Sequence, residues 1–357
     1  MLVPDCTLEP SQSNCSSPPL PPELLDRIIE LALEFRCSFH PSNKSEAIAS
    51  LTLVSTQFRG FAWRHYFRHI ILAECGQDKS PWREFCSAEK QIGENCFSWV
   101  RTLRASSKTL TFHSAQLSAL NYLQELSVDL STEGLRSQLP ILKRICLALL
   151  SCCSSVDNIN ASHTLTILTL TSLPRIDIPL LRLIAESFPR LVDLHLSCTE
   201  RLDLHCCWLC YEESLGVTVH SPVPEMFSHS RDMAVASAKT LVPLKHLQHI
   251  HFGVYLSDEA LVHDHIRHGN EEGEFPFGPE QCILCDEVGT EVQLRELAAG
   301  LEFAQYLKAL RTIGFSSFFE DGTECHSDGQ WTDKTTVYVL RENGRIRVRK
   351  APWPSAR

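Results

Sequence analysis

The sequence predicts an α/β protein in which a helical N-terminal segment precedes a solenoid of short parallel strands and outer helices. Three observations lead to this prediction. Residues 20–70 place apolar side chains at helical spacing, residues 99–350 repeat one short apolar unit, and amphipathic stripes separate several of these units. With 357 residues, 43% of them apolar, the chain has enough material for two or three domains with a sizeable core.

The helical segment follows residues 1–17, a stretch rich in Ser and Pro that we expect to be a disordered tail. Two prolines then introduce a first helix, and a polar loop over 34–49 precedes a second short helix over 51–62. The aromatic and basic stretch 63–70 predicts a third helix. The apolar positions of the first helix are Leu24, Leu25, Ile28, Ile29 and Leu31. These stripes alone fit equally well a small helical subdomain that packs on the rest of the chain.

Residues 18–70 resemble an F-box in the order of three motifs. These are Leu-Pro-x-Glu-Leu-Leu at 20–25, Leu-x-x-Val-Ser-x-x-Phe-Arg at 51–59, and the aromatic-basic third segment. Family membership implies a three-helix hook that docks on the Skp-type adaptor of a cullin ubiquitin ligase. The loop over 34–49 is longer than the usual connection of the family, which leaves the setting of the two helices open. The residues expected to make or support the adaptor contact are Leu20, Pro21, Leu24, Leu25, Ile28, Leu53, Val54 and Phe58.

Composition limits the classes of partner and compartment. A net charge of −10 disfavours generic binding to nucleic acid or to an acidic membrane. The start of the chain lacks the features of a signal or transit peptide, and no apolar run approaches the roughly 18 residues of a spanning helix. We therefore expect a cytoplasmic or nuclear protein, whose 16 cysteines are reduced thiols or metal ligands.

Beyond an irregular connector over 71–98, a repeated unit begins: an apolar residue, two others, an apolar residue, one other, and a third apolar residue. Each copy resembles the strand core of a leucine-rich repeat, in which alternate residues of a short parallel strand turn inward. The copies begin at Val100, Leu123, Val156, Leu165, Leu191, Leu247 and Leu310. Helical stripes between them are Leu142, Ile145 and Leu149; Leu181, Ile184 and Phe188; and Leu294, Leu297, Leu301, Ala304 and Leu307.

The spacing of the copies is irregular, so the repeats are degenerate. Long gaps predict insertions at about 199–243 and 256–292. The structural alternative is a doubly wound α/β domain, but the chain has neither a G-x-G-x-x-G nor a P-loop sequence. In a solenoid the outward strand positions and the insertions form the surface that is open to a target protein. Alternation selects Gln124, Asp129, Thr169, Asp193, His195, Gln248, His249 and His251 as candidate target contacts.

Each insertion carries a Cys-x-x-Cys pair, a spacing that lets two thiolates hold one tetrahedral zinc ion from the same side. The pairs are Cys207 with Cys210 and Cys282 with Cys285, and Cys206 is a substitute for Cys207. Four such thiolates form a complete structural zinc site. The competing interpretation is a set of buried, inert thiols, which is common in a chain this rich in cysteine.

The chain closes with a predicted hairpin over 336–350, before a short tail over 351–357. Asn343-Gly344 lies between two alternating segments, which is the strongest short-range hairpin signal. Such a hairpin is suited to cover the apolar end of a solenoid. The basic residues Arg347 and Arg349 lie on its second face, either to keep this end soluble or to bind phosphate or acidic groups.

Motifs of enzyme chemistry are absent from the sequence, which has no Gly-x-Ser-x-Gly, no His-Glu-x-x-His and no kinase signature set. The resemblance implies a non-catalytic substrate-recognition subunit of an SCF-type cullin ubiquitin ligase. In that function the F-box binds the adaptor and the repeats bind a target protein. Two alternatives stay open: a zinc-stabilised leucine-rich-repeat scaffold without ligase function, and a cryptic thiol hydrolase.

Overall fold

A computed structural model describes residues 20–39, 48, 50–72, 96–150, 164–198, 227, 229–254, 256, 283–315 and 336–350. The chain forms two compact units, Met1–Phe67 and Arg68–Arg357. The two expected tails, most of the connector and the repeat copy at Val156 lie outside the described residues.

The first unit contains helices α1 (Pro22–Phe39) and α3 (Thr56–Arg68). The carbonyl of Pro21 accepts hydrogen bonds from the amides of Leu24 and Leu25 at 3.0 and 3.2 Å, so α1 begins at the second proline, where a missing N–H costs nothing. The amide of Phe58 donates to the hydroxyl of Ser55 at 3.2 Å, which caps the start of α3. The core of this unit is formed by Ile29, Leu33, Ile48 and Ala62, with Leu51, Phe58, Phe61 and Tyr66 packed against it.

The expected three-helix hook is not confirmed. The predicted second and third helices share one continuous helix, α3, because nothing between Thr56 and Arg68 breaks the hydrogen-bonding pattern and Gly60 is tolerated inside it. Residues 50–52 are also helical and precede the turn at Leu53 and Val54. The last two residues of the predicted third helix, His69 and Ile70, belong instead to a strand.

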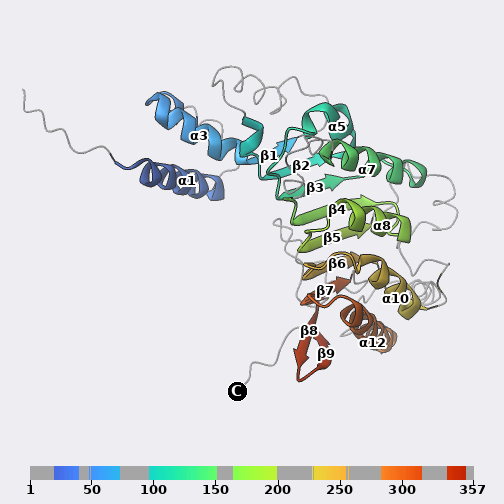
Figure 1. Cartoon of the computed structure of the whole chain (residues 1–357). Coiled ribbons are helices and arrows are strands. Elements are labelled where there is room, and N and C mark those ends of the chain that lie inside the picture. Colours follow the sequence, from blue (N-terminus) through green and yellow to red (C-terminus); the bar gives the residue numbers. More distant parts are fainter. Residues whose placement is uncertain are drawn as a thin grey trace, which may run out of the picture. The chain divides into compact units, whose positions relative to one another are not determined.

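The second unit is built on a sheet of nine strands in the described part of the chain, arranged in sequence order and not closed (Figure 1). Strands β1 to β7 are parallel to their neighbours, and β8 and β9 pair antiparallel at the end. The strands are β1 (His69–Leu72), β2 (Thr102–Ser106), β3 (Glu125–Asp129), β4 (Ile167–Leu173), β5 (Asp193–Cys198), β6 (His249–Gly253), β7 (Thr312–Phe315), β8 (Thr336–Glu342) and β9 (Arg345–Lys350). The predicted α/β class with short parallel strands is therefore confirmed.

The register explains why the repeated unit folds in this way. Equivalent apolar positions lie side by side across the strands, and all are buried: Ile70, Leu103, Leu126, Leu168, Leu194, Ile250 and Ile313. Just before each strand, a backbone carbonyl accepts a hydrogen bond from an amide of the segment that follows in the sheet. The first of these carbonyls is that of Arg68 and the last is that of Arg311, and the N···O distances are 2.7–2.9 Å. The apolar spacing thus sets the register, and the backbone ladder satisfies the polar groups between repeats.

Strand β1 is a repeat that the sequence prediction missed. Phe67, Ile70 and Leu72 have the spacing of the repeated unit and are buried, and β1 pairs with β2 in the same register as the later strands. The signal was present in the sequence, but it overlaps the third motif of the F-box resemblance.

Helices lie along one face of the sheet and follow one another in chain order (Figure 1). They are α5 (Ser107–Phe112), α6 (Ser114–Leu117), α7 (Leu135–Leu150), α8 (Ile178–Ser187), α10 (Ser230–Leu241) and α12 (Ile283–Tyr306). Helix α10 lies in the segment predicted as the first insertion, and α12 begins in the second. Parts of both segments are therefore ordinary outer helices of the repeat, and none of the described helices is long and apolar enough to cross a membrane.

The predicted stripes of α7 and α8 face the core, but that of α12 is wrong in part. Leu294 is 62% exposed, whereas Val292, Glu296 and Phe303 are buried. The reason is a tertiary contact: the ammonium of Lys350 on β9 pairs with the carboxylate of Glu296, so a charged side chain occupies a buried helix position.

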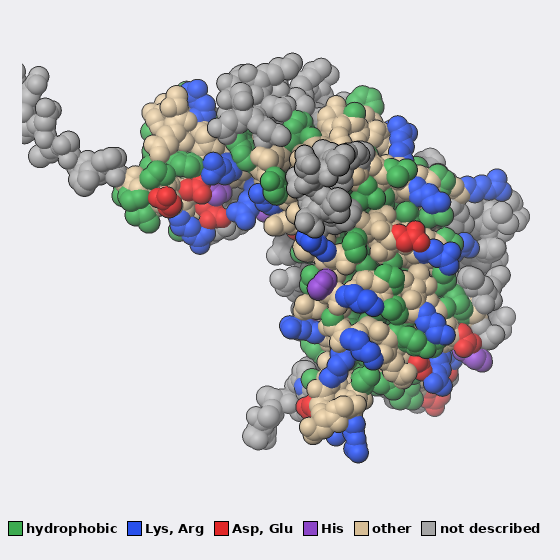
Figure 2. Space-filling view, viewed as in Figure 1, with side chains coloured by type: hydrophobic (Ala, Val, Ile, Leu, Met, Phe, Trp, Pro, Cys, Tyr) green, Lys and Arg blue, Asp and Glu red, His purple; other side chains and the backbone are tan. Residues whose placement is uncertain are grey.

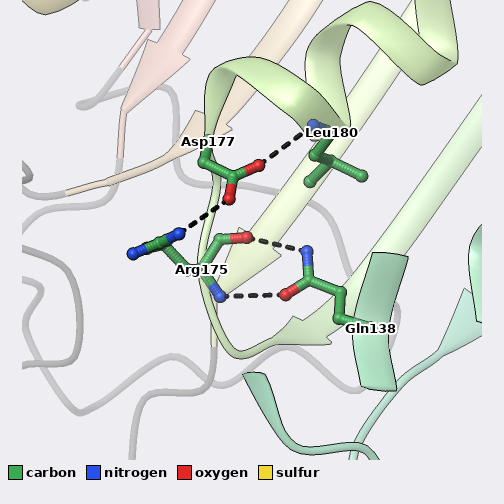
Figure 3. Close-up of polar contacts among 4 residues, drawn as sticks. All are labelled: Gln138, Arg175, Asp177 and Leu180. Atoms are coloured by element: carbon green, nitrogen blue, oxygen red, sulfur yellow. Dashed lines mark hydrogen bonds and ion pairs between the residues drawn. The ribbon is translucent and has the colours of Figure 1, made fainter. Parts of the chain in front are cut away.

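The loop between β4 and α8 is fixed by Gln138 of α7 (Figure 3). The amide of Gln138 donates to the carbonyl of Arg175 at 2.8 Å, and its oxygen accepts from the amide of Arg175 at 3.3 Å. Asp177 then caps α8 by accepting from the amide of Leu180 at 3.0 Å, and its second oxygen pairs with the Arg175 guanidinium at 2.9 Å.

We expect Gln138→Met to lower the free energy of unfolding by about 2 kcal/mol, because it removes both part-buried hydrogen bonds to the backbone of Arg175. Asp177→Ala removes a helix cap and should cost about 1 kcal/mol, whereas Asp177→Asn keeps the capping oxygen and should cost less. Chemical denaturation of the three variants measures this order. A Gln138→Met variant as stable as Asp177→Asn contradicts it.

The predicted terminal hairpin is confirmed. Asn343 and Gly344 adopt φ of 50° and 76°, as a two-residue turn with positive φ at both positions requires. Val337 and Val339 are buried, and β8 pairs with β7, so the hairpin extends the parallel sheet. The guanidinium of Arg341 donates to the carbonyls of Ala304 at 2.9 Å, Leu307 at 2.8 Å and Leu310 at 2.5 Å, and so caps the end of α12.

Candidate functional site

The first candidate site is an apolar surface of the N-terminal unit, which we call the α1 surface. Each of its residues is between 48% and 82% exposed, and Figure 2 shows hydrophobic side chains at the surface of this unit. The members are Leu20, Leu24, Ile28 and Leu31 from the start of α1, and Leu53 and Val54 from the turn before α3. Leu24, Ile28 and Leu31 share one side of α1, and exposed apolar groups that share a side mark an interaction site more often than isolated ones do.

Helix α1 carries apolar residues on two sides, and the fold buries only one of them. Ile29 and Leu33 face the core, whereas Leu24, Ile28 and Leu31 lie along one exposed side at the spacing of successive helical turns. The imidazole of His65 on α3 contacts the Asp26 carboxylate at 3.0 Å and fixes which side of α1 turns inward. The exposed stripe is thus held in place by the packing of the opposite side.

The predicted adaptor contacts divide into two groups. Leu20, Pro21, Leu24, Ile28, Leu53 and Val54 are exposed, and Leu25 is half-buried. Phe58 is half-buried and packs against the core of the unit, so its place is beneath the surface. Leu31 belongs to the exposed stripe but is missing from the predicted set, although its apolar spacing in the first helix was recognised.

The second candidate site is the face of the sheet opposite the helices, which we call the strand face. The register places its side chains in rows. One row comprises His69, Thr102, Glu125, Ile167, Asp193, His249, Thr312, Tyr338 and Arg349. The next comprises Ile71, Arg104, Ser127, Thr169, His195, His251, Gly314 and Thr336.

At the centre of the strand face, His195 on β5 and His251 on β6 stack. Their rings are nearly parallel, with 4.4 Å between centroids and 9° between planes. Gly314 on β7 leaves room for this stack, since a Cβ there would lie 2.8 Å from Nδ1 of His251. Both histidines are buried, and burial lowers the pKa of His195 to about 4 and that of His251 well below its ordinary value. The pair is therefore neutral at neutral pH and acts as a packed element of the face.

Polar contacts also link neighbouring strands elsewhere on this face. The Nδ1 atom of His249 lies 2.8 Å from the hydroxyl of Thr312, and burial raises the pKa of Asp193, an effect that His249 opposes. Nearer the start of the sheet, the Thr102 hydroxyl donates to Glu125 at 3.4 Å, and Arg104 lies 3.5 Å from the same carboxylate. Most side chains of the two rows are polar or charged, with Ile71 and Ile167 as apolar exceptions, in contrast to the apolar α1 surface.

Acidification from about pH 6.5 towards pH 4 should destabilise the fold through the histidine pair. Both pKa values are lower in the folded state than in the unfolded one, so the unfolded chain takes up protons first as the pH falls. For His195 the loss approaches 3 kcal/mol, about 1.4 kcal/mol per pH unit. Denaturation midpoints measured against pH should be flatter for His195→Gln/His251→Gln than for the wild type. Substituting the exposed His246 by Gln is the control, and profiles that stay parallel for the pair contradict the prediction.

Of the predicted strand-face residues, Asp129, Thr169, Asp193, His195, His249 and His251 lie on this face, although the histidine pair is buried. Gln124 and Gln248 precede their strands, and their carbonyls belong to the backbone ladder. Their assignment to strand positions was wrong, because each lies one residue before its strand; that they contact a target stays a prediction. Prediction missed Ile71, which lies on β1, and also Arg104, Glu125 and Ser127, which alternation within the predicted units at Val100 and Leu123 already reaches.

Three cysteines of the predicted zinc site, Cys207, Cys210 and Cys282, lie outside the residues that the structure describes, and of Cys285 on α12 only the backbone is described. Among described residues, no group of three or more His, Cys, Asp or Glu side chains is arranged to hold a metal ion. The zinc site stays a prediction. Cys96, Cys146 and Cys198 are buried and form no disulfide, and burial raises the pKa of Cys146 to about 11, so this thiol stays protonated.

Comparison with known proteins adds no relative. No protein-family model matches the chain, and a search of curated proteins finds no match either. Any function must therefore be inferred from the motifs and from the geometry of the α1 surface and the strand face.

Proposed function

We propose that the chain is a non-catalytic substrate-recognition subunit of an SCF-type cullin ubiquitin ligase. The N-terminal unit docks on a Skp-type adaptor, and the sheet-and-helix unit, a degenerate leucine-rich-repeat solenoid, binds a target protein. The observation that carries the proposal is an agreement between the sequence motifs and the exposure of the residues that they select. The F-box-like motifs pick out residues for the adaptor contact, and six of those eight are exposed on the N-terminal unit.

This agreement supports docking, because packing of the N-terminal unit does not require the exposed residues to be apolar. A small helical subdomain needs one apolar stripe on each helix, and Ile29 and Leu33 already supply that stripe for α1. The additional apolar residues at 24, 28 and 31 lose contact with water only when a partner covers them. A protein interface of ordinary size removes about 800 Å² from each partner, which suits one helix face and one turn.

The proposed target-binding role of the second unit rests on its layer arrangement. The outer helices are committed to packing on the sheet, while the strand face presents polar rows from β1 to β9. Parallel strands in sequence order make this face continuous, as binding to an extended surface of a target requires.

The direct test is co-expression of the full chain with a Skp-type adaptor, followed by purification through a tag on the adaptor. We expect a complex of equal stoichiometry that survives size-exclusion chromatography and recruits the cullin. A folded chain that elutes alone at micromolar concentration contradicts the proposal and favours a scaffold without ligase function.

A further inference from the structure

The outer strand of the sheet, β9, has an unusual charge pattern. The ten residues 341–350 contain five cations and one carboxylate, in a chain whose net charge is −10. The cations are Arg341, Arg345, Arg347, Arg349 and Lys350, and the carboxylate is Glu342.

Two of these cations contact α12 or the residues that follow it. Arg341 caps α12 through three carbonyls, and Lys350 pairs with the buried Glu296. A Cβ on Gly300 of α12 would lie 2.9 Å from Val337, so helix and hairpin approach closely. Together these contacts hold the hairpin rigidly against α12, which removes much of the entropy cost of ordering its edge for binding.

The other three cations share one face. The register pairs Arg349 with Tyr338, Arg347 with Leu340 and Arg345 with Glu342, so the arginines lie at alternate positions on the side that continues the strand face. Arg345 and Arg347 are exposed, and the ion pair between Arg347 and Glu342 is long, at 3.9 Å, with both side chains mostly in solvent. Such a pair is worth little and yields readily to a better placed carboxylate.

Strand β9 is also the last strand of the sheet: in the described part of the chain it pairs only with β8. Half of the backbone groups of an edge strand point away from its neighbour and can pair with an added strand. Alternating arginines repel a second copy of the same edge, so this edge selects against self-association and in favour of a strand of opposite charge.

We propose that β9 binds an extended acidic peptide as an added strand, with carboxylates at alternate positions facing Arg345, Arg347 and Arg349. The intervening residues of the peptide then lie beside Ile346 and Val348, which are half-buried, so alternating acidic and apolar residues fit best. This inference deepens the proposed function and rests on it for its role, because it names the kind of target segment that the receptor takes. The pairing itself needs no adaptor.

The test uses the full chain and a fluorescent octapeptide of alternating Glu and Val, with anisotropy as the measurement. We expect binding that falls about tenfold or more in Arg345→Glu/Arg347→Glu, because two attractive contacts become repulsive. The matched control is Arg136→Glu/Arg182→Glu, which changes the net charge equally at exposed positions of α7 and α8 and should leave binding unchanged. Slower amide exchange in β9 on addition of the peptide gives a second measurement that does not depend on charge.

Three outcomes overturn the proposal. An octapeptide of the same composition with its Glu residues in one block lacks the alternation, so an affinity equal to that of the alternating peptide shows that charge alone acts and excludes strand pairing. Equal losses in the two double variants exclude a site on β9, and equal or tighter binding of an oligothymidylate identifies a nucleic-acid surface instead. Adaptor co-purification of Arg345→Glu/Arg347→Glu separates the two proposals, since its persistence without peptide binding refutes only the peptide site.

Discussion

Replacing Leu24 and Ile28 by Ala should abolish co-purification with a Skp-type adaptor while the chain stays folded. Both side chains are about half exposed on α1, so their loss changes the free energy of unfolding by no more than about 0.5 kcal/mol. In a complex they are buried, and removing two such groups from the centre of an interface costs about 3 kcal/mol, more than a hundredfold in affinity. Titration of purified adaptor against the two chains measures this difference.

The matched control for this double variant is Leu147→Ala/Leu294→Ala. These leucines are 66% and 62% exposed on α7 and α12, so the control removes exposed apolar surface of similar size from the second unit. We expect it to bind adaptor as the wild type does. Equal binding by both double variants refutes the α1 surface as the docking site. If the first variant loses helicity, Leu53→Ala/Val54→Ala in the turn before α3 tests the same surface without touching α1.

Gly253→Ala should cause the largest loss of stability of any single methyl group added to the sheet. A Cβ at this position would lie 2.5 Å from the carbonyl oxygen of Leu196 and 2.8 Å from the Cα of Ser197, both backbone atoms of β5. No side-chain rotation relieves such a contact, so β5 and β6 must separate and lose hydrogen bonds at their paired ends. We expect a cost of about 3–5 kcal/mol in chemical denaturation.

Two other glycines calibrate this effect. Gly134→Ala meets open space and should be neutral or slightly stabilising. Gly314→Ala meets the ring of His251, a side chain that can shift, so its cost should be intermediate and should fall when His251 is also replaced by Ala. A Gly253→Ala variant that is as stable as Gly134→Ala shows that the strands separate more easily than the close approach implies.

The different success of the sequence predictions has a physical cause. Period-2 and period-3.6 apolar patterns are local, so the strands at Leu123, Leu165, Leu191, Leu247 and Leu310 and the turn at Asn343-Gly344 were predictable. A helix stripe that depends on a distant partner was not predictable. Glu296 is buried because Lys350 reaches it from β9, and no pattern within α12 contains that information.

The same distinction between local patterns and contacts with distant segments applies to the candidate sites. Motif order selected the residues of the α1 surface, but only packing shows that Phe58 lies beneath it and that Leu31 belongs to it. Alternation placed His195 and His251 on the strand face, but their stacking and lowered pKa values require neighbouring strands and the space left by Gly314.

Local sequence patterns were sufficient to predict the α/β class, the repeated strand unit and the terminal hairpin, and they contain the F-box-like order of motifs. All of these depend on residues within one or two turns or strands of each other. Tertiary structure decided which of the two apolar sides of α1 is exposed, that β1 starts the sheet, and that β9 ends it with a row of arginines on one face. These properties arise from contacts between distant segments, whose free energies depend on burial and register and not on local spacing.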